Sequence, residues 1–370
     1  MRNLWTTPGK SVLVIFVFIA LLVCCSSDDD SSTEPEETWA WSGLGSGTNA
    51  RIYALTVYDG KLIVGGEFDT AGGIEAFNIA AWNDTSWSTL GTGMNASVNA
   101  LTVYDNKLIA AGNFTTAGGV TANHIAAWDG TSWTLLGDGL NHYVFALTVY
   151  DNKLIAGGMF NMAGISSAMN VAAWDGSSWS ALGAGVDDWV RALEVYQDKL
   201  YVGGQFVNAG GIVANGIANW NGTNWAPCTQ GVSHDAVDPI VYALAVHGTR
   251  LYVGGVFDVA GGVSADNIAS ISTVAWYTLS TGTNEAVHAL VSHDGKLVAG
   301  GYFNYVAGKQ VNYIAAWNGS SWSALGEGVD GNYYPHVKAM TVYNNSLIAA
   351  GRFTTAGADT VNNIAEWKVE

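Results

Sequence analysis

The chain has 370 residues and a formal net charge of −17, with 46 glycines, 12% aromatic residues and only 12% charged residues. Globular proteins carry about 25% charged residues, so this composition favours many short strands joined by tight turns. The negative charge excludes binding to nucleic acid, because phosphate contacts need clustered Lys and Arg. A neutral ligand, calcium or a locally matched anion is compatible with the composition.

The first 38 residues predict an export signal followed by a tether. The apolar run 12–23 follows two basic residues and has the length of a signal-peptide core rather than of a membrane span. The sequence Leu-Val-Cys-Cys at 22–25 resembles the lipobox of bacterial lipoproteins, with Cys25 as the lipidated residue and Cys24 as the alternative. The acidic tract that follows resembles the export tags of surface-displayed lipoproteins of some Gram-negative bacteria. Residues 26–38 are nearly devoid of apolar side chains, which predicts a disordered acidic tether.

We therefore expect an exported outer-membrane lipoprotein that is exposed at the cell surface and touches the membrane only through its lipid. A plain secretory peptide followed by a polar linker is the alternative.

The rest of the chain consists of seven copies of one unit. The second copy shows its four strand signals, which are W-S-T-L-G, V-N-A-L-T-V-Y, K-L-I-A-A-G-N-F and H-I-A-A-W, all rich in β-branched and aromatic residues. Asp-Asn or Asp-Gly pairs predict a tight hairpin between the first two strands of a unit. The first tryptophan of the unit recurs every 46 residues, stretched to 51 and 50 in two places, at Trp41, Trp87, Trp133, Trp179, Trp225, Trp276 and Trp322.

The two ends of the pattern distinguish a ring from a solenoid. The pattern begins on a fourth strand at 41–45 and ends on a third strand at 364–367. Only in a ring can the N-terminal strand complete the last unit, whereas a solenoid would need polar caps. We predict an all-β fold, a seven-bladed β-propeller of four-stranded blades, with a signal peptide over 1–25, the tether over 26–38 and the propeller over 39–370.

The motif Leu-Tyr-Val-Gly-Gly at 200–204 and 251–255, followed by Asn-x-Ile-Ala-x-Trp and x-x-Trp-x-x-Leu, resembles the kelch repeat of kelch-type β-propellers. The units are also similar to repeats of bacterial surface proteins and of fungal cortical marker proteins that carry G-G-x-F-x-x-A-G-G and W-x-G-x-x-W-x-x-L-G. The WD40 pattern and the sialidase Asp-box are missing. The resemblance implies a propeller but little about function, because propellers bind, scaffold and catalyse alike.

Variation between the copies is concentrated on one face. The fourth-to-first and second-to-third connections are long and lie on the same side, and both length changes, at 230–240 and 326–336, fall in the fourth-to-first connection. Loop variability on a rigid scaffold is typical of recognition. The alternative is that these positions vary only because the fold tolerates many residue types there. Just inside this face, one first-strand position changes from copy to copy while its neighbours barely change, and it reads Tyr53, Asn99, Phe145, Arg191, Tyr242, His288 and Lys338.

Basic residues on this face indicate a polar or anionic ligand, because Arg binds carboxylates with its planar fork. Trp189 is expected to be exposed, where it could stack on a sugar or anchor a protein, with loop packing as the alternative. The predicted ligand-binding residues are Arg51, Tyr53, Tyr143, Phe145, Asp187, Asp188, Trp189, Arg191, His234, Asp235, Tyr242, His288, Tyr333, Tyr334, His336, Lys338 and Arg352.

No zinc-protease, phosphate-loop or nucleophile-elbow motif occurs in the sequence. Cys228 stands at a Leu position of the repeat and is expected in the core. No cofactor or metal is expected, although Asp187 and Asp188 leave calcium possible. The sequence thus predicts a non-catalytic surface lipoprotein that binds a glycan or an envelope or extracellular protein. The alternatives are a polysaccharide lyase or hydrolase using His288, Tyr242, Arg191 or nearby acidic residues, and a structural subunit of an envelope complex.

Overall fold

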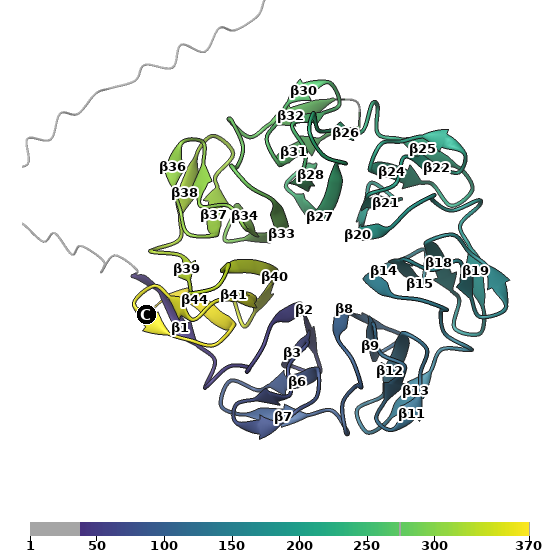
Figure 1. Cartoon of the computed structure of the whole chain (residues 1–370), viewed down its shortest axis with the longest axis horizontal. Helices are drawn as coiled ribbons and strands as arrows, with labels where there is room; N and C mark the ends of the chain where they lie inside the picture. The colour runs from purple at the N-terminus through teal and green to yellow at the C-terminus, as the bar shows by residue number, and fades with distance from the viewer. Residues whose placement is uncertain (1–37, 274, 370) are drawn as a thin grey trace, which may run out of the picture. The chain divides into compact units, whose positions relative to one another are not determined.

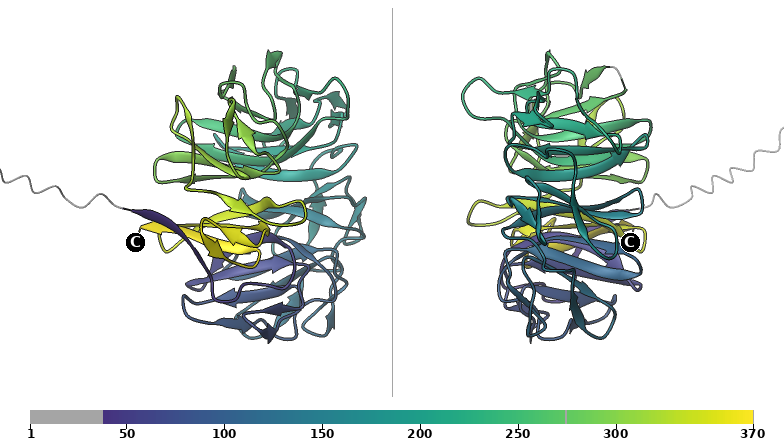
Figure 2. Two further views of the ribbon diagram at one scale, coloured as in Figure 1. Left: turned by 60° about the vertical axis from the view of Figure 1, so that its left-hand side comes forward. Right: turned by 90° about the vertical axis from the view of Figure 1, so that its right-hand side faces the viewer.

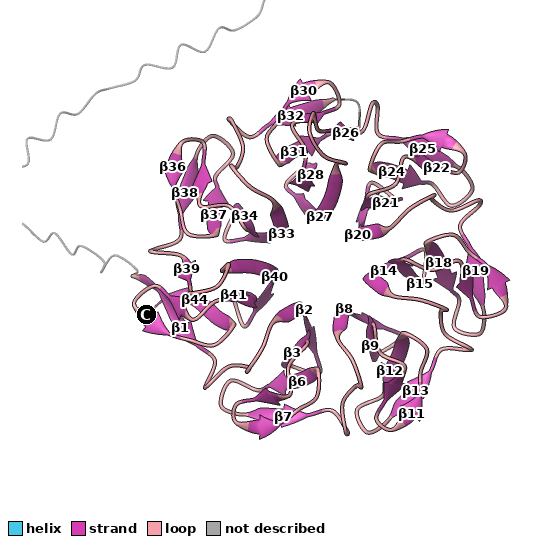
Figure 3. Ribbon diagram, viewed as in Figure 1, coloured by secondary structure: helices cyan, strands magenta, loops and turns pink. Residues whose placement is uncertain are grey.

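The computed structural model describes residues 38–273 and 275–369, which form strands and contain no helix (Figure 3). The predicted signal peptide, Cys25 and nearly all of the predicted tether lie outside the described residues. Figure 1 shows the described part as a ring of sheets around a central axis, and Figure 2 shows the same ring from the side. No helix that could cross a membrane is present in this part of the chain.

Seven antiparallel four-stranded sheets form the blades, and the first strand of each blade lies nearest the axis (Figure 1). Blades 1 to 3 consist of β2 (Ile52–Tyr58), β3 (Lys61–Gly66), β6 (Ile79–Trp82) and β7 (Trp87–Thr89); β8 (Val98–Tyr104), β9 (Lys107–Gly112), β12 (Ile125–Trp128) and β13 (Trp133–Leu135); and β14 (Val144–Tyr150), β15 (Lys153–Gly158), β18 (Val171–Trp174) and β19 (Trp179–Ala181). Blades 4 and 5 consist of β20 (Val190–Tyr196), β21 (Lys199–Gly204), β24 (Ile217–Trp220) and β25 (Trp225–Pro227); and β27 (Ile240–His247), β28 (Arg250–Val256), β31 (Ile268–Ile271) and β32 (Trp276–Thr278). Blades 6 and 7 consist of β33 (Val287–His293), β34 (Lys296–Gly301), β37 (Ile314–Trp317) and β38 (Trp322–Ala324); and β40 (His336–Tyr343), β41 (Ser346–Arg352), β44 (Ile364–Val369) and β1 (Trp39–Gly43). The predicted all-β propeller is confirmed.

The N-terminal strand β1 pairs with β44, so the first described strand completes the last blade. Trp41 donates its indole N–H to the carbonyl oxygen of Leu325 in blade 6, at 2.9 Å. In each of the other six blades the first tryptophan of the unit also donates its indole N–H to a partner in the preceding blade. For example, Trp87 donates to the carbonyl oxygen of Leu44 at 3.0 Å. A buried indole N–H needs an acceptor, so the recurrence of this tryptophan reflects contacts between blades.

The hairpin between the first and second strands has the predicted geometry. Asp105 and Asn106 have φ angles of 49° and 56°, and two successive positive φ values define a turn whose twist matches that of the flanking strands.

The second-to-third connection is more regular than the loop that the sequence predicts. In each blade it contains a short hairpin, and the preceding fourth-to-first connection pairs with it, either through a single bridge such as Thr48 to Ala71 or through β26 (Val232–Ser233) and β39 (Val329–Asp330). This pairing fixes the loops on the variable face. The hairpins are β4 (Thr70–Ala71) with β5 (Ile74–Glu75), β10 (Thr116–Ala117) with β11 (Val120–Thr121), β16 (Met162–Ala163) with β17 (Ser166–Ser167), β22 (Asn208–Ala209) with β23 (Ile212–Val213), β29 (Val259–Ala260) with β30 (Val263–Ser264), β35 (Tyr305–Val306) with β36 (Lys309–Gln310), and β42 (Thr355–Ala356) with β43 (Asp359–Thr360).

Candidate functional site

A β-bulge interrupts the first strand of every blade at the variable position. In blade 1, Ile52 pairs with Gly66 and Ala54 with Gly65, so Tyr53 is the extra residue, and the other six blades repeat this shift. A bulge leaves one residue out of the ladder and changes the direction of its side chain. The second strand of each blade carries a Gly-Gly or Ala-Gly pair opposite the bulge, and the last residue of this pair must be glycine. In blade 1, a Cβ on Gly66 would lie 2.2 Å from the carbonyl oxygen of Arg51.

These bulges bring all seven variable side chains to one cavity of about 340 Å³ near the axis, which we call the axial pocket. The volume falls within the range of about 300–1,000 Å³ that is usual for small-molecule sites. Below it, a cavity of about 230 Å³ shares four of these residues and is otherwise lined by the alanines, leucines and Met340 of the first strands. The axial pocket is lined by Tyr53, Asn99, Phe145, Arg191, Tyr242, His288 and Lys338, together with Glu67, Ser97 and Asn113.

One side of the axial pocket, formed by blades 4 to 7, carries hydrogen-bond donors and positive charge. Lys338 Nζ lies 2.9 Å from His288 Nδ1 and 5.2 Å from the centre of the Tyr242 ring. The rings of Tyr242 and His288 are 4.3 Å apart, and Tyr302 continues the aromatic wall 5.1 Å from His288. No carboxylate lies within ion-pair distance of Lys338 or Arg191 among residues 38–273 and 275–369.

The guanidinium group of Arg191 packs against two adjacent aromatic rings. Its central carbon lies 4.0 Å from the centre of the Phe145 ring and 4.7 Å from that of Trp189. Its Nε atom is buried and has no hydrogen-bond partner within the described part of the chain. Trp189 is half-buried, which corrects the expectation of an exposed loop tryptophan: it packs on Arg191 and fixes its position.

The opposite side of the axial pocket, formed by blades 1 and 2, is polar and uncharged apart from Glu67. Asn99 donates to the Oδ1 atom of Asn113 at 2.9 Å and to the carbonyl oxygen of Val144 at 3.1 Å. Amide and carboxylate groups of this kind can bind sugar hydroxyls as donors or acceptors.

Burial changes the pKa values of the titratable groups on the charged side of the pocket. It lowers the pKa of Lys338 to about 8, with the charge of Arg191 as a further cause. Burial and the nearby Lys338 hold the pKa of His288 well below its usual range, and burial lowers the pKa of His336 to about 4. The imidazoles are therefore neutral at pH 7, and Arg191 and Lys338 carry the charge.

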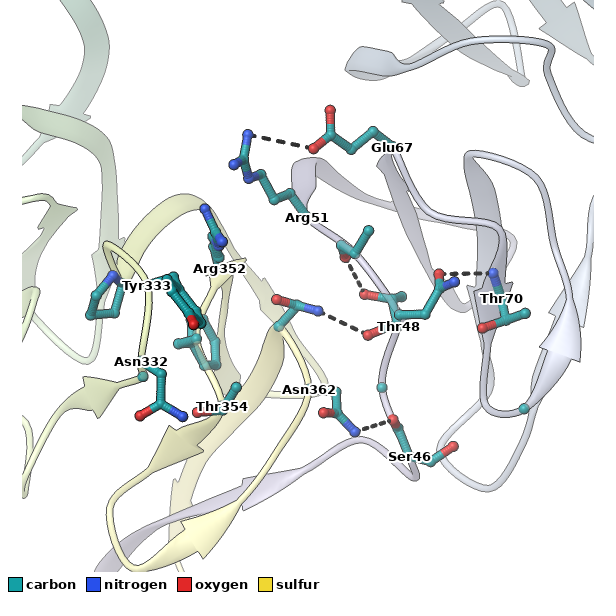
Figure 4. Close-up of a pocket in the computed structure, with 18 residues that line it drawn as sticks. Ser46, Thr48, Arg51, Glu67, Thr70, Asn332, Tyr333, Arg352, Thr354 and Asn362 are labelled. Carbon is teal, nitrogen blue, oxygen red and sulfur yellow. Dashed lines mark hydrogen bonds and ion pairs between the residues drawn. The ribbon is translucent and has the colours of Figure 1, made fainter.

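A second hollow, the seam groove, lies between blades 1 and 7 and has a volume of about 790 Å³ (Figure 4). Arg352 and the exposed Tyr333 line the blade 7 side, with the guanidinium carbon 6.0 Å from the Tyr333 ring centre. Asn362 and Asn363 donate to the carbonyl oxygens of Ser46 and Thr48 at 3.0 and 2.8 Å, which holds the two blades together at the base of the groove.

Glu67 lines both hollows, so the seam groove and the axial pocket are adjacent. Its carboxylate lies 3.5 Å from Arg51 Nη1, and Figure 4 shows this ion pair at the edge of the groove. Burial raises the pKa of Tyr53, just inside the axial pocket, to about 12, and a hydrogen bond with Glu67 adds to the effect.

The other predicted residues lie elsewhere on the variable face. Asp187 Oδ1 accepts the backbone N–H groups of Val207 and Asn208 at 2.9 Å, the bracing role that Asn fills in other blades, as Asn49 does for Thr70. Asp188 accepts the N–H of Trp189 at 2.8 Å. No group of three or more potential metal ligands occurs among the described residues.

Tyr143, His234, Asp235 and Tyr334 do not line either hollow. The Tyr143 ring lies 4.2 Å from that of His142, and His234 Nδ1 lies 3.3 Å from Asp258. Tyr334 is highly exposed, and its carbonyl oxygen lies 2.9 Å from Nδ1 of the buried His336. Cys228 is buried in the core, where burial raises the pKa of its thiol to about 12.

Four residues near the axis were not predicted from the sequence: Glu67, Ser97, Asn113 and Tyr302. Glu67, Asn113 and Tyr302 occupy the x position of G-G-x-F or A-G-x-F, which follows the bulge glycine and also varies from copy to copy. That variation is a sequence signal for this second layer of pocket residues.

The fold and the ring of converging residues define the chain as a β-propeller protein. Residues 30–189 match the family model for the Rax2 C-terminal beta propeller domain, and residues 293–315 match that of a domain of unknown function (DUF5122) beta-propeller. No curated protein matches the sequence.

Solved structures with the same fold include the WD40 beta propeller domain of Doa1, with 15% identity, a TM-score of 0.57, and coverage of 89% of this chain and 96% of that one. The extracellular domain of the putative hybrid two-component system BT4673 from B. thetaiotaomicron has 10% identity, a TM-score of 0.58 and coverage of 89% of this chain and 39% of that one. At these identities the likeness concerns the fold alone.

Proposed function

We propose that this protein is an exported, lipid-anchored binding protein that holds a glycan in the seam groove and the axial pocket. The observation that carries the proposal is the convergence of all seven variable first-strand residues on one pocket beside a polar groove. A repeated scaffold that varies mainly where its side chains meet a cavity is typical of recognition. Export is supported by the signal-peptide and lipobox pattern of residues 1–25 and is compatible with the extracellular setting of one structural neighbour.

The groove has the chemistry that sugars require. Tyr333 is 72% exposed and offers a ring for stacking. Arg352 on the same side of the groove, and Arg51 and Glu67 on the blade 1 side, add charged donors and an acceptor (Figure 4). Sugars present apolar faces and hydroxyl edges, so an aromatic side chain among polar groups fits both.

The test is binding of the purified protein to a broad glycan array, with and without a calcium chelator. The variant is Tyr333→Ala, and the matched control is Tyr277→Ala, which also removes a surface tyrosine packed on an arginine, Arg250 at 3.8 Å, but lies outside the groove. We expect specific binding that falls at least tenfold in Tyr333→Ala and is kept in Tyr277→Ala.

Absence of binding to any glycan would overturn the proposal. Capture of an envelope protein without glycan affinity would instead favour a structural or protein-binding role. Turnover of a bound polysaccharide that is lost in His288→Ala would favour the lyase or hydrolase alternative. Loss of binding in the chelator arm would assign calcium a role in the site.

A further inference from the structure

The positive groups of the axial pocket lack the partners that buried charges normally have. Lys338 and Arg191 form no ion pair within the described residues, and the buried Nε–H of Arg191 has no acceptor. Buried charges and unpaired buried donors are unfavourable unless a partner satisfies them. The missing partner in this pocket is an acceptor with negative charge.

The donors face the axial pocket from four successive blades. Arg191 lies in blade 4, Tyr242 in blade 5, His288 in blade 6 and Lys338 in blade 7, and all four line the same cavity. An ammonium group has no lone pair, so His288 Nδ1 accepts from Lys338 and the remaining proton of the neutral ring is on Nε2. The wall therefore offers the N–H groups of Arg191, Lys338 and His288 and the hydroxyl of Tyr242.

We infer that the axial pocket binds one anionic group, a carboxylate or a sulfate, and that this group belongs to an acidic sugar residue of the glycan in the seam groove. The inference rests on the proposed function and adds to it the chemical class of the ligand. Charge-assisted hydrogen bonds from Arg and Lys are the strong contacts for such groups. Asn99, Asn113 and Glu67 on the opposite wall are placed to bind the hydroxyls of the same sugar.

The shape of the site also fits a single acidic residue at the end of a chain. The axial pocket has less than half the volume of the seam groove, about 340 against 790 Å³, and the two meet at Glu67. The cavity below the axial pocket shares four residues with it, including Arg191, but is otherwise lined by alanines, leucines and Met340, and Lys338 does not line it. Only the axial pocket therefore offers both cationic groups. The anion is therefore expected to remain beside Arg191 and Lys338.

The test uses isothermal titration of the purified protein at pH 7 with three probes: glucuronate, glucose and inorganic sulfate. We expect glucuronate to bind at one site and glucose to bind at least tenfold more weakly, since glucose lacks the carboxylate. Lys338→Asn and Arg191→Gln should each weaken glucuronate binding at least tenfold. Blade 2 has an asparagine, Asn99, at the bulge position that Lys338 occupies in blade 7, so Lys338→Asn is compatible with the fold.

The control variant is Lys153→Ala, which removes one positive charge from a hairpin on the opposite face and should leave the affinity unchanged. Thermal unfolding of each variant shows whether it is folded. Binding of sulfate alone among the three probes would support a sulfated rather than a carboxylated sugar, and a sulfated monosaccharide should then bind more tightly than sulfate. Equal affinity for glucose and glucuronate, or glucuronate binding unchanged in both site variants, would overturn the inference.

Failure of the inference and failure of the proposed function give different results. If array glycans bind through Tyr333 but acidic ones bind no better than neutral ones, the glycan site stands and the anion site is wrong. If glucuronate binds through Lys338 but no array glycan binds, the anion site stands and the glycan function is wrong.

Discussion

Lys338 Nζ and His288 Nδ1 are 2.9 Å apart, and in this contact the ammonium group donates to an imidazole nitrogen that carries no proton. His288 accepts the hydrogen bond and is neutral, while burial lowers the pKa of Lys338 to about 8. The blade 4 to 7 side of the pocket thus has one permanent positive charge, on Arg191, and one positive charge, on Lys338, that titrates near physiological pH.

The first prediction concerns the pH dependence of glucuronate binding. The titratable groups around Lys338 are Arg191, Tyr242, His288, Tyr302 and His336. Burial raises the pKa of Tyr242 and lowers those of both histidines, so among these shifted groups only Lys338 changes charge between pH 7 and 9. The affinity should fall about tenfold between pH 7 and 9 as Lys338 loses its proton. Titration calorimetry across this range measures it, and Lys338→Arg, which stays protonated, should be much less sensitive to pH.

The second prediction concerns stability. The folded-state pKa of Lys338 lies below its unfolded value of 10.5, so the folded chain binds fewer protons and stability rises with pH from about 8 to 10.5. Below pH 8 the charged, buried ammonium is a destabilising group. Lys338→Met should therefore raise the free energy of unfolding at pH 7 by about 1 kcal/mol. Urea unfolding at pH 7 and 10.5 checks this, and a gain that does not shrink at the higher pH would contradict the explanation.

The third prediction tests ring closure. Trp41→Phe removes the hydrogen bond that joins the N-terminal strand to blade 6 and should lower the free energy of unfolding by about 2 kcal/mol. Trp133→Phe removes the equivalent bond to Leu90 between blades 1 and 2, at 2.9 Å, and is the matched control. Similar losses in urea unfolding are expected, since both bonds join neighbouring blades. A loss confined to Trp133→Phe would show that β1 does not contribute to the closed ring in solution.

The fourth prediction concerns Glu194, which stands where blades 1, 2, 3 and 7 have Thr. Burial raises the pKa of its carboxyl group. The folded chain then holds this proton more tightly than the unfolded chain, so stability falls as pH rises through the folded-state pKa. Glu194→Thr should stabilise the protein by about 1 kcal/mol at pH 7 and by less at pH 4. Thermal unfolding at the two pH values measures the difference, and an equal or larger effect at pH 4 would be inconsistent with a buried charge.

Much of the fold could be predicted from individual residues. The Asp-Asn pair at 105–106 predicts its hairpin because few residues adopt positive φ, and the recurrent tryptophans predict equivalent blades. The role of Asp187 could not be predicted in the same way. The sequence suggested that it binds a ligand, but its Oδ1 atom accepts the backbone N–H groups of Val207 and Asn208, and its Oδ2 atom accepts from the side chain of Asn208. Only the pairing of the two connections brings these groups within reach.

Trp189 shows a second limit of sequence reasoning. Its position outside the repeat pattern indicated a special role, but the pattern contains no information about what covers its ring. The contacts with Arg191 and Phe145 depend on the distance between two first strands. The half-buried residue packs on Arg191, which agrees with the loop packing that the sequence left open as the alternative to an exposed contact.

The sequence by itself determined the repeating unit, its strands and its turns, because each copy must satisfy the same local backbone and packing requirements. It also identified the first-strand position that varies. Only the tertiary structure decided that these side chains share one pocket. A bulge takes each of these residues out of the hydrogen-bonded ladder of its sheet, and the closed ring places residues as distant in the chain as Tyr53 and Lys338 around one axis. Charge and pKa in the pocket follow from that convergence, because burial and neighbouring cations act through space and not along the chain.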